Sequence, residues 1–143
     1  MTTQAILLPL FYEVILTFAL LFWLAPLRGG DISSGVARPD NIALREPNWS
    51  PHTLQVAYAY SNQFELPVLF YVLTILEYVT HSAGFVFVVL AWIFVLFRYL
   101  QAFVHVTSNK VRLRGAFFAV SAIVLAIMWL IYIVEVLTVP PPL

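Results

Sequence analysis

The sequence contains few charged residues and no cysteine. Lysine and arginine number seven and aspartate and glutamate seven, so only 10% of the 143 residues are charged and the formal net charge is zero. With no excess of positive charge, nothing indicates a nucleic-acid partner or a polybasic lipid anchor. The absence of cysteine excludes disulfides, thiolate metal sites, palmitoylation and a thiol nucleophile supplied by the protein.

The motifs of soluble enzymes are also missing. The sequence has no phosphate-binding glycine loop, no nucleophile elbow, no haem-attachment signature and no pair of histidines at metal-binding spacing. His81 and His105 are predicted to lie on opposite sides of a membrane, and His52 and His105 have no further ligand clustered with them. The sequence therefore predicts no metal site.

Apolar residues are abundant. Hydrophobic residues make up 62% of the chain and aromatic residues 16%, and the mean hydropathy is +0.93. Soluble domains are nearer half apolar and a quarter charged. A hydrocarbon core about 30 Å thick is crossed by about 20 helical residues. The sequence therefore predicts an all-α integral membrane four-helix bundle, with residues 1–143 forming one domain.

Four apolar runs separated by short polar segments give the predicted spans. They cover residues 5–27, 54–79, 83–106 and 116–137, and the proline-rich tail at 139–143 ends the last one. Pro26, followed by Gly29 and Gly30, is expected to end the first span. Pro67 is expected to kink the second span near Gln63, because a proline frees the carbonyl four residues before it.

The basic residues predict the orientation of the chain. Those outside the spans are Arg28, Arg38, Arg45, Lys110, Arg112 and Arg114. All six lie in or beside the first and third connections, so the positive-inside rule places both of these loops in the cytoplasm and both termini outside. We expect a multi-pass protein of the cell membrane: the cytoplasmic membrane in a bacterium, or the endoplasmic reticulum in a eukaryote.

One polar stripe runs along the second span. It consists of Gln55, Tyr58, Asn62 and Glu65. Spacings of three, four and three residues keep these side chains within an arc of about 80° at about 100° per residue. At a rise of about 1.5 Å per residue, Glu65 lies roughly 16 Å from the cytoplasmic end of the span. A carboxylate at that depth needs a partner or water, since burying it costs about 2.5–3.5 kcal/mol.

The third span carries a matching stripe of Arg98, Gln101 and His105. The turn at 80–82 is very short, so the second and third spans are expected to be antiparallel neighbours. Arg98 then lies roughly 12 Å from the cytoplasmic end, at a depth similar to that of Glu65. We predict that Glu65 and Arg98 pair, either within a subunit or across an oligomer interface.

A simpler interpretation is that these polar residues only hold helices together, at about 0.6–2 kcal/mol per bond. Arg112 and Arg114 are expected near the cytoplasmic end from topology alone, but Arg114 opens the fourth span and can point inward. His105 is either an acid–base group or a hydrogen-bonded structural residue.

Three acidic residues lie toward the outer side. Glu77 and Glu135 are expected to snorkel to the interface, and Glu13 to be protonated or hydrogen-bonded within the bundle.

These residues resemble the motif of the MAPEG family (membrane-associated proteins in eicosanoid and glutathione metabolism). The family's second-span Asn-x-x-Glu corresponds to Asn62 and Glu65. Its third-span arginine, the polar positions one and two turns later and the arginine at the start of the fourth span correspond to Arg98, Gln101, His105 and Arg114. The resemblance covers nearly the whole chain and is to a divergent, bacterial-type member.

The resemblance implies a homotrimer with active sites between subunits that open to the cytoplasm. It implies glutathione as cosubstrate, with Asn62, Glu65, Arg98, Gln101 and His105 as the binding residues. Arg114 would be the catalytic residue that stabilises the thiolate, because a guanidinium is permanently charged and lowers the pKa of a nearby thiol. The expected activity is a glutathione-dependent transferase or peroxidase acting on a lipophilic small molecule that arrives from the bilayer.

One departure from the family pattern favours other functions. Members that use glutathione commonly have arginines just before the Asn, where this chain has Tyr58, Tyr60 and Ser61. Arginines of the first loop, Arg28, Arg38 or Arg45, are candidates to replace them. The alternatives are a non-catalytic accessory or structural subunit of a larger membrane complex, and a protein that binds a lipid or another anionic metabolite in the same pocket.

Overall fold

The computed structural model describes residues 1–138, so the predicted role of the 139–143 tail lies outside the described residues. The six helices are α1 (Thr3–Ser33), α2 (Pro39–Ile42), α3 (Pro51–Asn62), α4 (Leu66–Val79), α5 (Phe85–Val106) and α6 (Val111–Thr138). The protein is all-α, as predicted, and residues 1–138 contain no strand.

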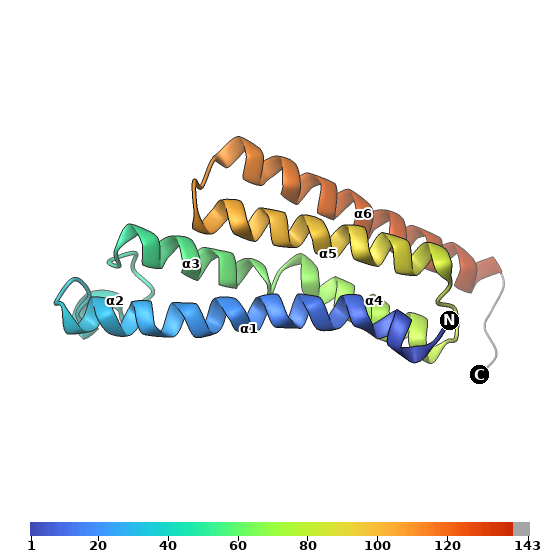
Figure 1. The fold of residues 1–143 in the computed structure, drawn as a ribbon, viewed down its shortest axis with the longest axis horizontal. Helices are drawn as coiled ribbons and strands as arrows, with labels where there is room; N and C mark the ends of the chain where they lie inside the picture. The colour runs from blue at the N-terminus through green and yellow to red at the C-terminus, as the bar shows by residue number, and fades with distance from the viewer. Residues whose placement is uncertain (139–143) are drawn as a thin grey trace.

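The long helices lie lengthwise beside one another (Figure 1). α5 packs most closely against α6, and α1 contacts α3, α4 and α5. Within the described residues, α1, α5 and α6 are each long and apolar enough to cross a membrane. Their length and apolar composition make this a membrane protein.

The second predicted span is two helices rather than one bent helix. Gln63, Phe64 and Glu65 separate α3 from α4. Their backbone N–H groups donate to the carbonyls three residues earlier, at 3.0, 3.0 and 3.3 Å. Pro67 is the cause, since it has no N–H for the Gln63 carbonyl and fits the first turn of a new helix. The predicted position of the distortion near Gln63 is confirmed.

The first predicted span ends later than expected. α1 continues through Pro26, Gly29 and Gly30 to Ser33, so the prediction that these residues end the helix is wrong. Contacts with the following loop hold these turns in place: the Asp31 carboxylate accepts a hydrogen bond from the Ser50 backbone N–H at 2.9 Å. Such tertiary contacts outweigh the low helix propensity of glycine.

The predicted start of the last span is also wrong, because the helix begins earlier in the chain. α6 begins at Val111, five residues before the predicted start at 116, so Arg112 and Arg114 lie in its first turns. Asn109 ends the preceding helix: it has a positive φ of 52°, and its N–H donates to the Val104 carbonyl at 2.7 Å. An asparagine in the left-handed conformation is a common helix stop.

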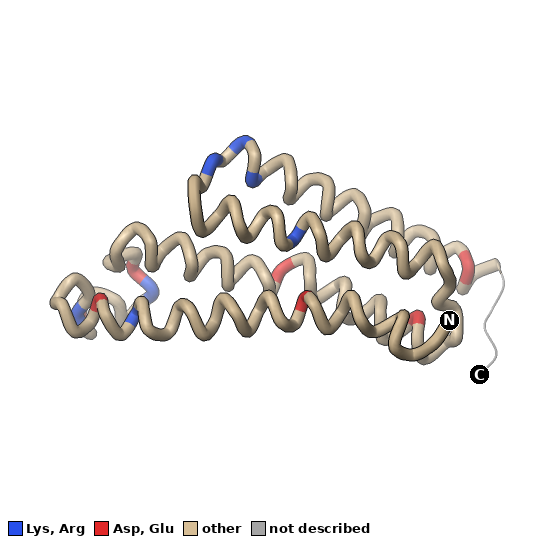
Figure 2. Tube along the Cα trace, viewed as in Figure 1, with Lys and Arg blue, Asp and Glu red and all other residues tan. Residues whose placement is uncertain are grey.

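The basic residues gather toward one end of the bundle, whereas acidic residues lie at both ends and in the middle (Figure 2). We call the end where α1 finishes and α6 begins the basic end, because it contains all Lys and Arg except Arg98. The opposite end, where α4 finishes and α5 begins, is the acidic end and contains Glu77 and Glu135. Glu77 is 3% exposed, so the prediction that it snorkels is wrong: it lies on the face that α4 buries.

The largest core cluster joins α4, α5 and α6. Phe70 and Phe94 stack at its centre with ring centroids 4.8 Å apart, and both are fully buried. Ala91 is fully buried beside them. Small residues at such positions let membrane helices approach closely, and dispersion contacts then stabilise the packing. This core holds α5, which carries Arg98, Gln101 and His105, at a fixed position.

Candidate functional site

The two predicted polar stripes face each other across the contact between α3 and α5. The Arg98 Nη2 donates to the backbone carbonyl of Asn62 at 3.0 Å, and the Asn62 amide lies 3.5 Å from His105 Nδ1. About two turns nearer the basic end, the Gln55 amide donates to the Thr107 carbonyl at 3.3 Å. The predicted antiparallel contact of these stripes is confirmed.

The helix break creates the binding position for Arg98. Asn62 is the last residue of α3, so its carbonyl lies at the negative end of a helix and has no i+4 partner in a regular turn. The Arg98 guanidinium supplies a charged donor there, and it is only 1% exposed. The backbone of α3 therefore positions Arg98 at the depth of Asn62.

Glu13 is a buried acidic residue beside this contact whose role the sequence left open. It is 0% exposed and its two carboxylate oxygens have no hydrogen-bond partner, while Nε and Nη1 of Arg98 also have none. Glu13 and Arg98 are thus two buried, oppositely charged groups whose polar atoms are left unpaired. The sequence did contain a signal, because Glu13 lies at helical spacing with the buried residues Ile6 and Leu16 of α1.

Gln63 and Gln101 add two more buried amides. Gln63 is 2% exposed and donates from Nε2 to the Ala59 carbonyl at 2.9 Å, and Gln101 is 3% exposed. The Oε1 atoms of both have no partner within the chain. We call the polar residues at and beside the contact between α3 and α5 the polar cluster. Its members are Glu13, Asn62, Gln63, Arg98, Gln101 and His105. Unpaired acceptors at this depth are costly unless water or a ligand pairs with them.

Glu65 does not pair with Arg98 inside one chain. Glu65 is exposed in the gap between α3 and α4, and within the described residues the only ion pair is Arg38–Asp40. The prediction of an intrachain pair is wrong, because the break turns Glu65 outward while Arg98 is held by the Asn62 carbonyl. The pairing across an oligomer interface stays a prediction.

Arg114 lies at the basic end, beside the polar cluster. Its Nη1 donates to the Asn109 side chain. Arg114 is half-buried, whereas Arg112, two residues earlier, is exposed. The structure thus brings Asn62, Arg98 and His105 together by direct contacts and leaves Glu65 and Arg114 at the margins of the cluster.

A cavity of about 420 Å³ opens at the basic end, and we call it the loop cavity. The residues of interest on its wall are Arg28, Arg45, Trp49, Tyr58, Tyr60 and Ser61. The Arg28 guanidinium lies over the Trp49 ring, 5.3 Å from its centroid. Arg28, on the last turns of α1, and Arg45, in the first connection, therefore reach the segment just before Asn62, where the sequence lacks arginine.

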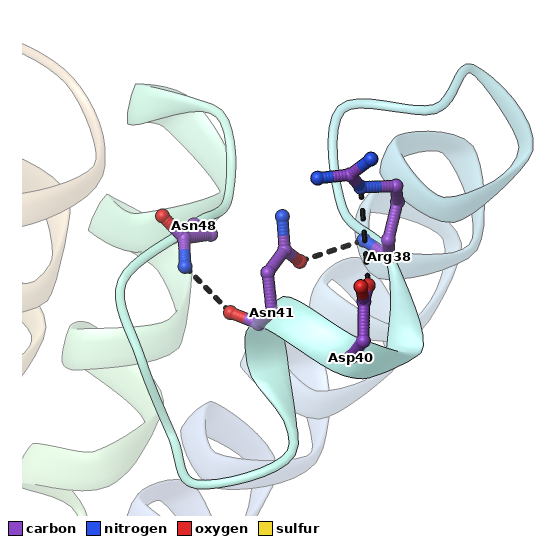
Figure 3. Close-up of polar contacts among 4 residues, drawn as sticks. All are labelled: Arg38, Asp40, Asn41 and Asn48. Carbon is purple, nitrogen blue, oxygen red and sulfur yellow. Dashed lines mark hydrogen bonds and ion pairs between the residues drawn. The ribbon is translucent and has the colours of Figure 1, made fainter.

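Hydrogen bonds fix the loop that carries Arg45 (Figure 3). The Asn41 side chain accepts from the Arg38 backbone N–H at 2.8 Å, and the Asn48 amide donates to the Asn41 carbonyl. Arg38 pairs with Asp40 at 3.9 Å in solvent and does not line the loop cavity. Arg38 is therefore separated from the two loop arginines that face the cavity.

No group of three His, Asp or Glu side chains within residues 1–138 is placed to hold a metal ion. The donors of the polar cluster are amides, a guanidinium, an imidazole and one carboxylate. Such a set suits a polar organic ligand with carboxylates and amides better than a hard cation.

Comparison with models of known protein families identifies the family of this chain. The model of the MAPEG family matches residues 6–134, which include the polar cluster and the wall of the loop cavity. The chain belongs to the MAPEG family. Searches of curated proteins and of solved structures found no match.

Membership agrees with the physical features of the chain. This MAPEG protein is a membrane protein of a family in glutathione and eicosanoid metabolism, and its apolar helices agree with that setting. The family motif residues Asn62 and Arg98 are in direct contact. The family assignment was predicted from these residues and is confirmed.

The buried charges predict a measurable coupling between Glu13 and Arg98. The two groups form no ion pair within 4 Å, but both are buried and oppositely charged, so each lowers the cost of burying the other. We expect Arg98→Met to lower the unfolding temperature strongly in detergent. The Glu13→Gln/Arg98→Met double variant should be less destabilised than the sum of the single variants, with a coupling of about 0.5–3 kcal/mol.

The matched control is the exposed pair, for which Arg38→Met and Asp40→Asn should couple by no more than about 0–1 kcal/mol. Strict additivity of Glu13→Gln and Arg98→Met would show that the two buried groups do not interact.

Proposed function

We propose that this MAPEG protein is a membrane-embedded, glutathione-dependent transferase or peroxidase acting on lipophilic electrophiles. The observation that carries the proposal is the proximity of the polar cluster to the loop cavity. Asn62, bonded by Arg98, directly follows Tyr60 and Ser61, which share the cavity wall with Arg28 and Arg45. Anion-binding and amide-binding groups thus adjoin at one end of an apolar bundle.

The chemistry of glutathione fits these groups. The tripeptide has two carboxylates, one ammonium, two amides and a thiol. Arginines bind carboxylates through paired, charge-assisted hydrogen bonds, so Arg28, Arg45 and Arg98 suit its two ends. Asn62, Gln101 and His105 suit the amides, and the exposed Glu65 carboxylate suits the ammonium. The loop arginines would replace those missing before Asn62.

Arg114 is the proposed catalytic residue. Its guanidinium would stabilise the glutathione thiolate and lower the thiol pKa below about 8.5, so that more thiolate exists at neutral pH. In the transferase reaction the sulfur attacks an electrophilic carbon, a sulfur–carbon bond forms, and the leaving group departs with its electron pair. With a peroxide, sulfur attacks oxygen, the oxygen–oxygen bond breaks and the alcohol leaves after protonation, which leaves glutathione as its sulfenic acid. The thiolate of a second glutathione then attacks that sulfur, the disulfide forms and the oxygen leaves as water.

A homotrimer would complete this site. Glu65 points outward from a single chain and Arg114 lies at the margin of the polar cluster, so a neighbouring copy can bring a second set of groups to them. Many large apolar side chains are exposed, including Phe22, Phe85 and Phe103 at 70%, 73% and 66%. Lipid and neighbouring subunits would cover them. The basic end would face the cytoplasm, with both termini outside, in a multi-pass topology.

The first prediction concerns binding by the loop arginines. We expect glutathione to bind the trimer in nanodiscs, and Arg28→Met or Arg45→Met to raise the Kd about 10–100-fold, as loss of a hydrogen bond to a charged group implies. Isothermal titration measures both. Arg38→Met is the matched control and should bind normally. An equal loss in that control, or no binding at millimolar glutathione, would contradict the proposal.

The second prediction concerns catalysis by Arg114. Arg114→Met should lower kcat for conjugation of glutathione to chlorodinitrobenzene by about 10²–10³, the usual effect of removing one electrostatic stabiliser. Because the guanidinium lowers the thiol pKa, its loss should move the pH–rate profile upward toward about pH 8.5. Arg112→Met should leave kcat and the profile unchanged. A profile that Arg114→Met does not move would remove Arg114 from the reaction.

A second candidate function is a non-catalytic subunit of a larger membrane complex. Tyr58, Tyr60 and Ser61 favour it, because they stand where glutathione-using members commonly have arginines. Extraction of the native protein in mild detergent, followed by mass measurement, separates the two proposals. The enzymatic proposal expects a stand-alone homotrimer, whereas a stoichiometric partner that co-purifies would support the accessory role.

A further inference from the structure

A second cavity lies at the acidic end, on the opposite side of the bundle from the loop cavity. Its volume is about 210 Å³, and it lies between the end of α4, the start of α5 and the last turns of α6. Two carboxyl groups, Glu77 and Glu135, are on its wall, and Phe85, Phe87 and Ile131 supply apolar surface. We call it the acidic cavity.

Glu77 is buried in this wall without a complete set of partners. It is only 3% exposed, and its Oε2 has no hydrogen-bond partner. The nearby Ser82 hydroxyl is already engaged with the Thr80 hydroxyl, at 3.0 Å. Leaving a buried carboxylate oxygen unpaired is costly, so the cavity provides space for a donor that the chain itself does not supply.

The ionisable side chains on the cavity wall are both acidic. The described part of the acidic end contains no lysine or arginine (Figure 2). The N-terminus lies at the same end (Figure 1), but its residues do not line the cavity. A positively charged ligand would therefore be attracted without competition from a cationic side chain of the wall.

The composition of the wall favours an organic cation over a metal ion. Hard divalent cations take six or more oxygen ligands, while this wall offers two carboxyl groups and one hydroxyl among apolar residues. Aromatic rings such as Phe85 and Phe87 stabilise ammonium groups and bind hydrocarbon. The volume is below the about 300–1,000 Å³ of cavities for drug-sized ligands, so the ligand is small.

We propose that the acidic cavity binds a small lipophilic primary amine, with its ammonium between Glu77 and Glu135 and its apolar body against Phe85 and Phe87. An ammonium has three N–H donors, enough to bond to the carboxyl groups of Glu77 and Glu135 together. The body reaches the cavity from the bilayer, because Phe85 and Val86 are 73% and 57% exposed on the outside of the bundle. This site is separate from the proposed glutathione site.

The test uses phenethylamine and the uncharged alcohol of the same shape, phenethyl alcohol. With the full-length protein in nanodiscs at neutral pH, we expect the amine to raise the unfolding temperature and to give a saturable titration, because a ligand that binds only the folded state stabilises it. The alcohol should do neither. Glu77→Gln and Glu135→Gln should each weaken amine binding at least tenfold, and Asp40→Asn, an exposed carboxylate at the basic end, should not.

Several outcomes would overturn the proposal. They are equal effects of the amine and the alcohol, equal losses in Asp40→Asn and Glu77→Gln, or stabilisation by calcium chloride but not by the amine. Should Glu77→Gln fail to fold, Glu135→Gln decides alone, because Glu135 is exposed and its replacement leaves the core intact.

Discussion

The contact between Arg98 and the carbonyl of Asn62 depends on a broken helix, and the rest of the basic half is built around it. Pro67 removes an N–H and leaves the chain between α3 and α4 without regular helical hydrogen bonds. The Asn62 carbonyl accepts one long backbone hydrogen bond there, from the Glu65 N–H at 3.3 Å, and can accept a second donor. Arg98 on α5 provides it, which explains how a guanidinium is kept at 1% exposure inside a membrane protein.

The same contact explains why the family motif is more than a set of packing residues. Packing alone requires one donor for the Asn62 carbonyl, but the structure also places a buried carboxylate, two buried amides and an imidazole within the same region. Polar atoms that are buried without a hydrogen bond lower the stability of a closed bundle. They are useful where a polar ligand or water completes the hydrogen bonds, as in the proposed glutathione site.

The two ends of the bundle differ in a way that fits two different ligands. The basic end has one arginine over an aromatic ring, a hydrogen-bonded loop and a larger cavity. The acidic end has two carboxyl groups in a smaller, mostly apolar cavity. Because the bundle keeps these charges apart, an anionic tripeptide at one end and a lipophilic ammonium at the other would not compete.

Composition and spacing determined the class of this protein: its low charge, four apolar runs and polar stripes predicted an all-α membrane protein and the position of the distortion near Gln63. The family was predicted from the resemblance of its motif residues. These properties are local, since they depend on residue type and helical period. Tertiary structure decided the partners. Whether Arg98 meets Glu65, Glu13 or a backbone carbonyl depends on how the break turns Glu65 outward and how α1 packs, and spacing along one helix contains no information about either. The loop arginines likewise reach the segment before Asn62 only because folding carries a distant connection back over α3.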